Sequence, residues 1–249
     1  MKMILCFIGL LSNGLYAQSQ VGIINYRQLE NQPLDPGYSG NGTLIITKTS
    51  SFYTEKSLLA DKEGEEIKDQ VNISTIYGKS SNNEIDQFYL DFSKRQVLSN
   101  ERILSQFFPV KDTLLKPQWK ISTEKRKIGG YDCLKAVGMV RNRTYTAWFT
   151  PAIPVSAGPW KLWGLPGLIL EATSTDGAVK FLFQSLQLTP NGPTLNPPKF
   201  RKKPVTLAQF IAYRKERLRQ MKKMDLGSNF KEVGGLTEIN TFSVENFPN

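Results

Sequence analysis

The stretch from Ala147 to Thr175, AWFTPAIPVSAGPWKLWGLPGLILEATST, combines aromatic residues, prolines, glycines and an apolar run in one continuous segment. Pro151 and Pro154 lack the amide hydrogens that a β-sheet requires, so the aromatic strand before them must stop at Thr150. This constraint divides the stretch into a strand, a connecting segment and a second strand.

The connecting segment contains two predicted turns. Gly158 and Pro159 form the first, because glycine takes backbone angles closed to other residues and proline excludes the helical region for its predecessor. Gly164 and Gly167 flank the second turn. From Leu168 to Thr175 the residues then alternate with the two-residue period of a strand.

Strand patterns continue on both sides of this stretch. Asp176-Gly177 is a strong hairpin signal and joins the strand that starts at Leu168 to a strand over Ala178–Leu188. Eight or more antiparallel strands predict a mainly β (α+β) fold, with a curved antiparallel sheet or half-barrel. The other predicted strands are Val21–Leu29, Gly40–Tyr53, Gln87–Phe92, Gln96–Ser99, Phe107–Leu115, Trp119–Arg126, the Cys133 region and Thr144–Phe149.

One C-terminal amphipathic helix is predicted to pack on this sheet. A polar loop over Thr54–Asn83 and a proline-rich linker over Pro190–Pro204 interrupt the strands before it. Thr206 and Gln209 have the spacing of a capping box, so the helix begins there and extends to about Met224. Its apolar residues recur mostly at steps of three and four: Leu207, Phe210, Ile211, Leu218, Met221 and Met224.

The first residues predict export. Lys2 precedes a short apolar run, and Ala17 and Gln18 mark a cleavage site, so residues 1–17 are expected to be a signal peptide. Residues 18–249 then form a single β-rich domain that is periplasmic or secreted. Cys6 lies inside the apolar run and follows no small-residue lipobox, which argues against a lipid anchor.

The composition restricts the available chemistry. The sequence has no histidine and two cysteines, which excludes Ser-His and Cys-His nucleophile pairs and zinc sites built on imidazole. Removal of the signal peptide leaves Cys133 as the remaining cysteine, and we expect it to be a buried, apolar-like thiol. We expect no cofactor and no metal site. A catalyst in this chain would use Asp, Glu, Lys or Tyr.

The formal net charge is +10. A solvated helix face and the helix dipole explain much of this excess, and contact with anionic lipid headgroups is the alternative. No nucleic-acid-binding module is recognisable, so nucleic acid is not an expected partner. The cations gather on and before the predicted helix: Arg201, Lys202, Lys203, Arg214, Lys215, Arg217, Arg219, Lys222 and Lys223.

The hexapeptide from Gly164 to Ile169 is the one that names the GLPGLI family of Gram-negative envelope proteins, which have no established activity. The chain from Val21 to Leu218 is similar to that family in length and order of features. The strand order also resembles the half-barrel of periplasmic lipoprotein carriers. These resemblances imply an exported β-rich protein with an apolar or amphipathic ligand or an outer-membrane protein as its partner.

Two interpretations of the hexapeptide stay open. Its glycines and proline fit a tight turn that feeds a buried strand, and they also permit close approach of a ligand. The candidate ligand-binding residues are Trp148, Trp160, Trp163, Gly164, Pro166 and Gly167. A concavity under the helix is expected to be lined by Trp148, Phe149, Trp160, Trp163, Phe181, Phe183, Phe210 and Ile211, with the rings filling the space themselves.

Two functions are consistent with these patterns. The first is a non-enzymatic envelope protein that binds a ligand or an outer-membrane partner. The alternative is a carboxylate-dependent hydrolase or accessory module for surface glycans, since glycosidases need two suitably spaced acids. Glu171 and Asp176 are the available acids, although Glu171 on an alternating strand is expected to face solvent or to be paired. Asp112-Thr113-Leu114 also resembles a bacterial O-glycosylation acceptor, with Thr113 as the modified residue.

Overall fold

A computed structural model describes residues 21–31, 36–57, 86–103, 106–189 and 195–225. The predicted signal peptide with its cleavage site at Ala17 and Gln18, most of the Thr54–Asn83 loop and the C-terminal tail lie outside these residues. The described residues form one 12-stranded sheet with a C-terminal helix on it, which confirms the predicted fold class.

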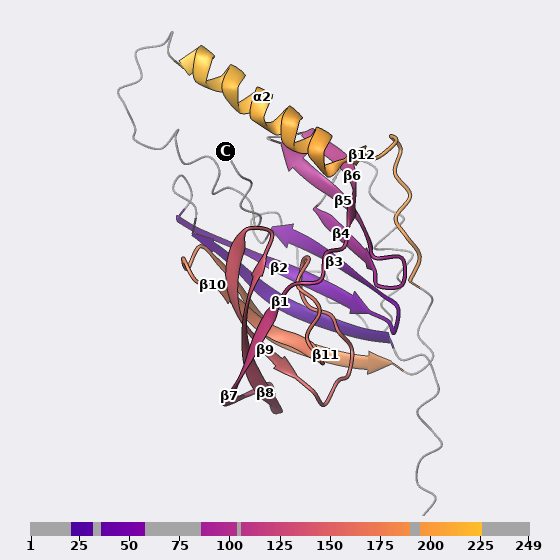
Figure 1. Cartoon of the computed structure of the whole chain (residues 1–249), viewed down its shortest axis with the longest axis vertical. Helices are drawn as coiled ribbons and strands as arrows, with labels where there is room; N and C mark the ends of the chain where they lie inside the picture. Colours follow the sequence, from indigo (N-terminus) through magenta and orange to yellow (C-terminus); the bar gives the residue numbers. More distant parts are fainter. Residues whose placement is uncertain (1–20, 32–35, 58–85, 104–105, 190–194, 226–249) are drawn as a thin grey trace, which may run out of the picture.

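The helix and strands are named in Figure 1. They are β1 (Val21–Asn31), β2 (Pro36–Ile46), β3 (Ser50–Ser57), β4 (Gln87–Asp91), β5 (Gln96–Ile103), β6 (Gln106–Thr113), β7 (Trp119–Ile128), β8 (Tyr131–Val140), β9 (Arg143–Thr150), β10 (Leu168–Ser174), β11 (Val179–Thr189), β12 (Val205–Thr206) and α2 (Leu207–Asp225).

The sheet consists of two meanders that meet in the middle. Its strand order is β12-β6-β5-β4-β3-β2-β1-β11-β10-β9-β8-β7, so β1 pairs with β11 and joins the first half of the chain to the second. The neighbouring strands are antiparallel except β12, which runs parallel to β6. The predicted hairpin at Asp176-Gly177 is present between β10 and β11.

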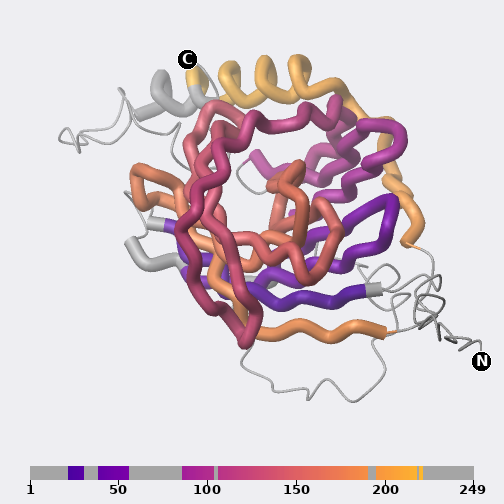
Figure 2. Tube along the Cα trace, turned by 60° about the horizontal axis from the view of Figure 1, so that its bottom comes forward, coloured from indigo at the N-terminus to yellow at the C-terminus, as the bar shows by residue number. Residues whose placement is uncertain are grey.

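The sheet is strongly curved, and the segment between β9 and β10 lies inside the curve (Figure 2). We call residues 151–167 the inner loop. Its apolar side chains belong to the main core cluster together with residues from β1 to β4 and β8 to β11. The predicted end of β9 at Thr150 and the start of β10 at Leu168 are both confirmed.

The predicted strand over Gly40–Tyr53 is two strands in the structure, β2 and β3. They are joined by a tight turn that contains no glycine or proline. The Thr47 hydroxyl accepts a hydrogen bond from the Ser50 amide at 3.0 Å, and the Thr47 amide donates to the Ser50 carbonyl at 2.8 Å. A threonine side chain thus closes the turn, which the search for glycine and proline missed.

The predicted capping box starts the helix. The Gln209 Oε1 atom accepts from the Thr206 amide at 2.9 Å, and the Thr206 Oγ1 atom accepts from the Gln209 amide at 3.2 Å. Within the described residues α2 is the one helix, and it is not long and apolar enough to span a membrane.

The predicted place of the helix over the aromatic concavity is wrong. Phe210 is buried against Ile103 of β5 and Val110 of β6, and Ile211 packs on the same small cluster. β12 pairs with β6 at the edge of the sheet, and α2 continues directly from β12. This connection holds the start of the helix at the sheet edge, so Phe210 and Ile211 do not line the aromatic part of the core.

The proline-rich segment before β12 is held on the sheet by one side chain. Leu195 is buried with Ile45 of β2, Phe52 of β3 and Tyr89 of β4, in a cluster separate from the main core. Residues 196–204 are otherwise half-buried or exposed, as expected of a linker that crosses the surface.

Cys133 is buried on β8, as the sequence predicts. Its Sγ atom lies 3.6 Å from the Tyr131 carbonyl oxygen, and burial raises the pKa of the thiol to about 11. A thiol with such a pKa holds its proton at neutral pH, so it is a poor nucleophile.

Candidate functional site

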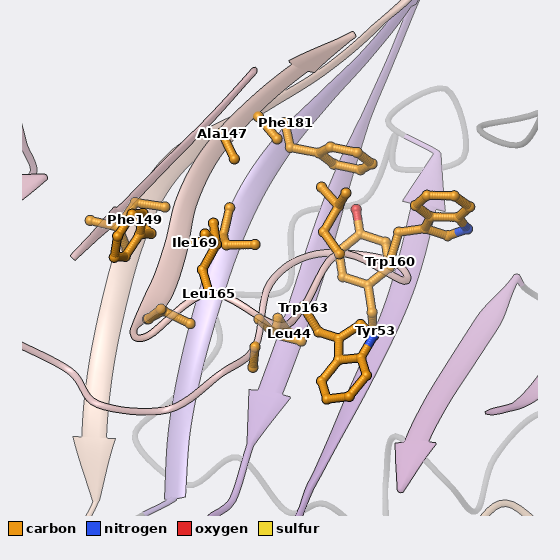
Figure 3. Close-up of a cluster of buried hydrophobic side chains, with 14 of the residues drawn as sticks. Leu44, Tyr53, Ala147, Phe149, Trp160, Trp163, Leu165, Ile169 and Phe181 are labelled. Carbon is orange, nitrogen blue, oxygen red and sulfur yellow. The ribbon is translucent and has the colours of Figure 1, made fainter. Parts of the chain in front are cut away.

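Two aromatic rings of the inner loop, Trp160 and Trp163, lie among the buried apolar side chains of the sheet (Figure 3). Trp160 is 2% exposed, and its ring meets Phe88 of β4 edge to face at 6.4 Å between centroids. Trp163 is 8% exposed and stacks on Phe92 at 5.7 Å. The rings of the inner loop therefore pack against rings on and directly after β4, as in a closed core.

Hydrogen bonds between side chains and the backbone hold the loop around Trp163. The Trp163 indole donates to the Leu115 carbonyl at 2.9 Å, and the Trp119 indole donates to the Trp163 carbonyl at 2.7 Å. The next residue, Gly164, has a φ of 94°, a region that favours glycine, and its amide donates to Ser156 Oγ at 2.9 Å. The bonds of Trp163, which directly precedes the hexapeptide, tie the inner loop to Leu115 and to the start of β7.

The second glycine of the hexapeptide is required by a close backbone approach. A Cβ atom at Gly167 would lie 2.2 Å from the Thr150 carbonyl oxygen, where β9 leaves the sheet. Leu165 is buried in the main core, and Pro166 between them is exposed. The hexapeptide thus closes the base of the inner loop.

Trp148 lies apart from the other predicted ligand-binding residues. Neighbouring residues of a strand face opposite sides, and Phe149 is the one that enters the core. Trp148 is half-buried under the Arg126 guanidinium, whose central carbon lies 4.5 Å from the ring centroid. The structure brings Trp160, Trp163, Gly164 and Gly167 together in the inner loop and leaves Trp148 on the outer face.

A buried ion pair also anchors the inner loop. The Lys161 ammonium donates to Glu101 Oε1 on β5 at 2.9 Å, and the Ser99 hydroxyl donates to the same atom at 2.6 Å. The ammonium also lies 5.3 Å from the Phe88 ring centroid. Burial alone raises the pKa of Glu101, but Lys161 and Ser99 outweigh it, so that the pKa is lower than usual.

A second polar group lies on β1 and β3. The Gln28 side-chain amide donates to Glu30 Oε1 at 2.6 Å and to Glu55 Oε2 at 2.8 Å. The Tyr53 hydroxyl donates to the Gln28 carbonyl oxygen at 2.6 Å. Gly42 on β2 makes room for this contact, since a Cβ atom there would lie 1.9 Å from the Tyr53 hydroxyl.

Asp86 lies between these two groups, directly before β4. Its carbonyl accepts from the Glu55 amide at 3.3 Å, and its carboxylate lies 3.7 Å from the Arg102 guanidinium. Burial raises the pKa of Asp86 to about 6 against the opposing effect of Arg102, and Glu101 and Glu30 add to the rise. Asp86 keeps an exposed side-chain fraction of 25%.

We call Glu30, Glu55, Asp86 and Glu101 the carboxylate row. Its members come from β1, β3, the start of β4 and β5, and three of them interact electrostatically. Sequence reasoning missed the row, because the acids lie singly in strands far apart in the chain. Little signal was available in the sequence, because Glu30 follows the predicted strand Val21–Leu29 and Glu101 follows the predicted strand Gln96–Ser99.

The acids that the sequence suggested do not form a pair. Glu171 binds Arg126 of β7, as the expected paired residue. Asp176 accepts from the Arg143 guanidinium at 2.7 Å, and the pKa of Asp176 is lower than usual, because hydrogen bonds and Arg143 outweigh burial. Each acid thus has its own arginine. Thr113, the predicted O-glycosylation residue, is exposed at the end of β6.

In the part of the chain that the structure describes, no three Cys, Asp or Glu side chains are placed to hold a metal ion. The carboxylate row can accept hydrogen bonds and attract positive charge. The raised pKa of Asp86 also leaves a carboxyl group that holds a proton at mildly acidic pH.

The family described as "Protein of unknown function (Porph_ging)" matches residues 139–171. This family corresponds to the GLPGLI proteins that the hexapeptide indicates. The matched segment covers the end of β8, all of β9, the inner loop and the start of β10. No curated protein matches the chain.

Two solved structures of PNGF-II match the chain. The structure in space group P21 is 17% identical in sequence and has a TM-score of 0.52. The match covers 78% of this chain and 32% of the PNGF-II chain. The structure in space group C2 is 19% identical in sequence and has a TM-score of 0.49, and the match covers 71% of this chain and 28% of the PNGF-II chain. The chain therefore spans about a third of the PNGF-II chain that it matches, and the likeness concerns the fold.

The close approach at Gly167 leads to a stability prediction. Gly167→Ala places a methyl group against the Thr150 carbonyl oxygen and is expected to destabilise the fold by about 1–3 kcal/mol. Urea unfolding measures the change. Pro166→Ala, at the exposed neighbouring position, is the control and should cost less than about 1 kcal/mol. Equal stability of Gly167→Ala and the unsubstituted protein would contradict the assigned role.

The buried ion pair leads to a second stability prediction. Lys161→Met leaves the Glu101 carboxylate without its cation and is expected to cost about 3–5 kcal/mol. Glu101→Gln in the Lys161→Met background should recover part of this loss, with a coupling energy of at least about 1 kcal/mol in a double-mutant cycle. The same cycle at the exposed pair of Lys127 and Asp132 should give less than about 0.5 kcal/mol. Equal coupling energies at the two pairs would show that burial does not strengthen the ion pair of Lys161 and Glu101.

Proposed function

We propose that the protein is an exported, GLPGLI-type protein of the cell envelope that binds a hydroxyl-rich ligand, a glycan, at the carboxylate row. The observation that carries the proposal is the placement of four carboxylates on and beside strands whose other side chains form the apolar core. Groups of this kind are costly to bury unless they have partners.

Polar side chains of the protein bond to three members of this row. Gln28 donates to Glu30 and Glu55, and Lys161 donates to Glu101. A carboxylate offers about four acceptor positions, so it can accept hydrogen bonds from several donors at once. Glycan hydroxyls are such donors, and the partly exposed Asp86 provides access from solvent. Because Trp160 and Trp163 of the inner loop pack against Phe88 and Phe92, they support an apolar ligand less well.

Three observations support the GLPGLI-type assignment and the export that this proposal includes. The hexapeptide is complete, the family match covers the inner loop and the strands that flank it, and the chain begins with the features of a signal peptide. The mature protein is then a single domain over residues 18–249, periplasmic or secreted, with an outer-membrane protein as a further candidate partner.

A carboxylate-dependent hydrolase for surface glycans is the second candidate. The observation that favours it is the pKa of about 6 for Asp86, next to Glu30 and Glu101. A general acid needs a carboxyl group that keeps its proton near the working pH, and a second carboxylate completes the pair. The candidate acids are therefore those of the carboxylate row, in place of Glu171 and Asp176.

A glycan array followed by titration calorimetry tests the binding proposal. The protein should bind at least one oligosaccharide, and Glu55→Gln should weaken that binding at least about tenfold, since one charged hydrogen bond contributes about 1.5–3 kcal/mol. Glu171→Gln, outside the row, is the matched control and should bind as the unsubstituted protein does. Absence of binding on the array, or equal loss in both variants, would refute the proposal.

The same bound oligosaccharide separates binding from hydrolysis. A hydrolase releases reducing ends from the oligosaccharide at pH 5. Its activity falls as the pH rises past about 6, because Asp86 then loses its proton. The Asp86→Asn variant is inactive. A binding protein leaves the oligosaccharide intact at every pH.

The pKa of Asp86 also predicts a pH-dependent stability. The folded value of about 6 lies above the ordinary 3.8, so its contribution to stability is fully present below pH 3.8 and is lost as the pH rises through 6. Asp86→Asn should therefore stabilise the protein at pH 7.5 by about 1–3 kcal/mol and change little at pH 4. Urea unfolding at both pH values measures this, with the exposed Asp132→Asn as control. Stabilisation by Asp86→Asn that is the same at both pH values would contradict the assignment.

A further inference from the structure

The first turns of α2 hold the helix to the sheet. Leu207, Phe210 and Ile211 pack on the edge cluster of β5 and β6. The Phe108 ring contacts Phe210 and Tyr213, each at 6.1 Å between centroids. In Figure 1 the remainder of α2 extends beyond the ends of β5 and β6. Among the helix side chains that the structure describes, those after Tyr213 do not belong to the packed cluster, so the later turns can meet a different partner.

The extending part of the helix is basic and exposed. Lys215, Arg217 and Arg219 are all exposed, and Glu216 bonds to Arg219 at 2.9 Å. Glu216 is the one acid in the sequence between Leu195 and Gln220. The charge of this segment is therefore strongly positive.

The same positive charge continues around the start of the helix. Lys202 and Lys203 are exposed just before β12, and Lys111 is exposed on β6, where it pairs with Thr206. We name six residues the basic edge: Lys111, Lys202, Lys203, Lys215, Arg217 and Arg219. They occupy the β12 edge of the sheet and the helix that continues from it.

The opposite edge of the sheet is also rich in cations, but acids balance several of them. On β7 Arg126 binds Glu171, and Lys127 lies 3.9 Å from Asp132. Glu124 of β7 binds Lys135 of β8 at 3.0 Å. The two edges thus differ in their uncompensated charge, and the β12 edge carries the larger excess.

From this charge distribution we propose that the basic edge docks the protein on a membrane surface through anionic lipid headgroups. Clustered cations near an anionic bilayer are attracted to its headgroups. Tyr213, with an exposed fraction of 50%, lies on the same helix, and its amphipathic ring suits the headgroup region. The charges on two sides of β12 match an extended charged surface. The docking is independent of the carboxylate row.

Sedimentation with lipid vesicles tests this inference. The protein, recovered after export from a Gram-negative host, should bind vesicles with 30% phosphatidylglycerol in phosphatidylcholine and should not bind pure phosphatidylcholine vesicles. Binding should disappear in 0.5 M NaCl, where about 4–5 Å of screening length remains. Lys215→Glu with Arg217→Glu should weaken binding at least about tenfold, because two attractive charges become repulsive.

Two further double variants separate docking from general effects. Lys202→Glu with Lys203→Glu leaves α2 unchanged and should weaken binding to a similar degree. Lys120→Glu with Lys125→Glu makes the same change in net charge on exposed positions of β7 and should bind as the unsubstituted protein does. Circular dichroism checks that each variant is folded. Equal loss of vesicle binding in all three double variants, or no binding of the unsubstituted protein to the anionic vesicles, would overturn the inference.

Discussion

The fold depends on filling the concave side of a strongly curved sheet. Flat sheets can bury one face on another layer, but a curved sheet of 12 strands encloses a space that its own side chains must fill. The inner loop supplies the additional side chains, with Trp160, Leu162 and Trp163 entering between the strands. Tyr26 of β1 is bonded to β10 directly after this loop, because its buried hydroxyl donates to the Ile169 carbonyl at 2.6 Å.

The requirements of the inner loop explain the composition of the hexapeptide. The loop must leave β9, turn inside the sheet and return to β10 beside its own starting point. Gly164 takes the positive φ, and Gly167 passes within contact distance of the Thr150 carbonyl. The Leu165 side chain is buried between these two positions. Packing and backbone geometry thus account for the glycines and Leu165 without a ligand.

Local patterns predicted the strands and the helix well, because each depends on neighbouring residues. The stop at Thr150, the hairpin at Asp176-Gly177 and the capping box at Thr206 are confirmed. The turn after Ile46 was missed, since Thr47 closes it by a side-chain hydrogen bond. The place of the helix was wrong, because it depends on the pairing of β12 with β6 across the chain.

The candidate site was less predictable, because it also depends on strand pairing across the chain. The strand order brings Glu30, Glu55, Asp86 and Glu101 near one another, and no local spacing connects them. The sequence offered Glu171 and Asp176 as the available acids, yet each binds its own arginine. The strand order, and not the local sequence, decides which acids lie near one another.

The matched segment and the carboxylate row occupy different parts of the chain. Residues 139–171 contain the inner loop with Lys161, while Glu30, Glu55, Asp86 and Glu101 all precede them. The buried ion pair of Lys161 and Glu101 joins the two parts directly. In this chain the hexapeptide therefore helps to fill the concave side of the sheet, whereas the carboxylates lie on β1, β3 and β5 and directly before β4.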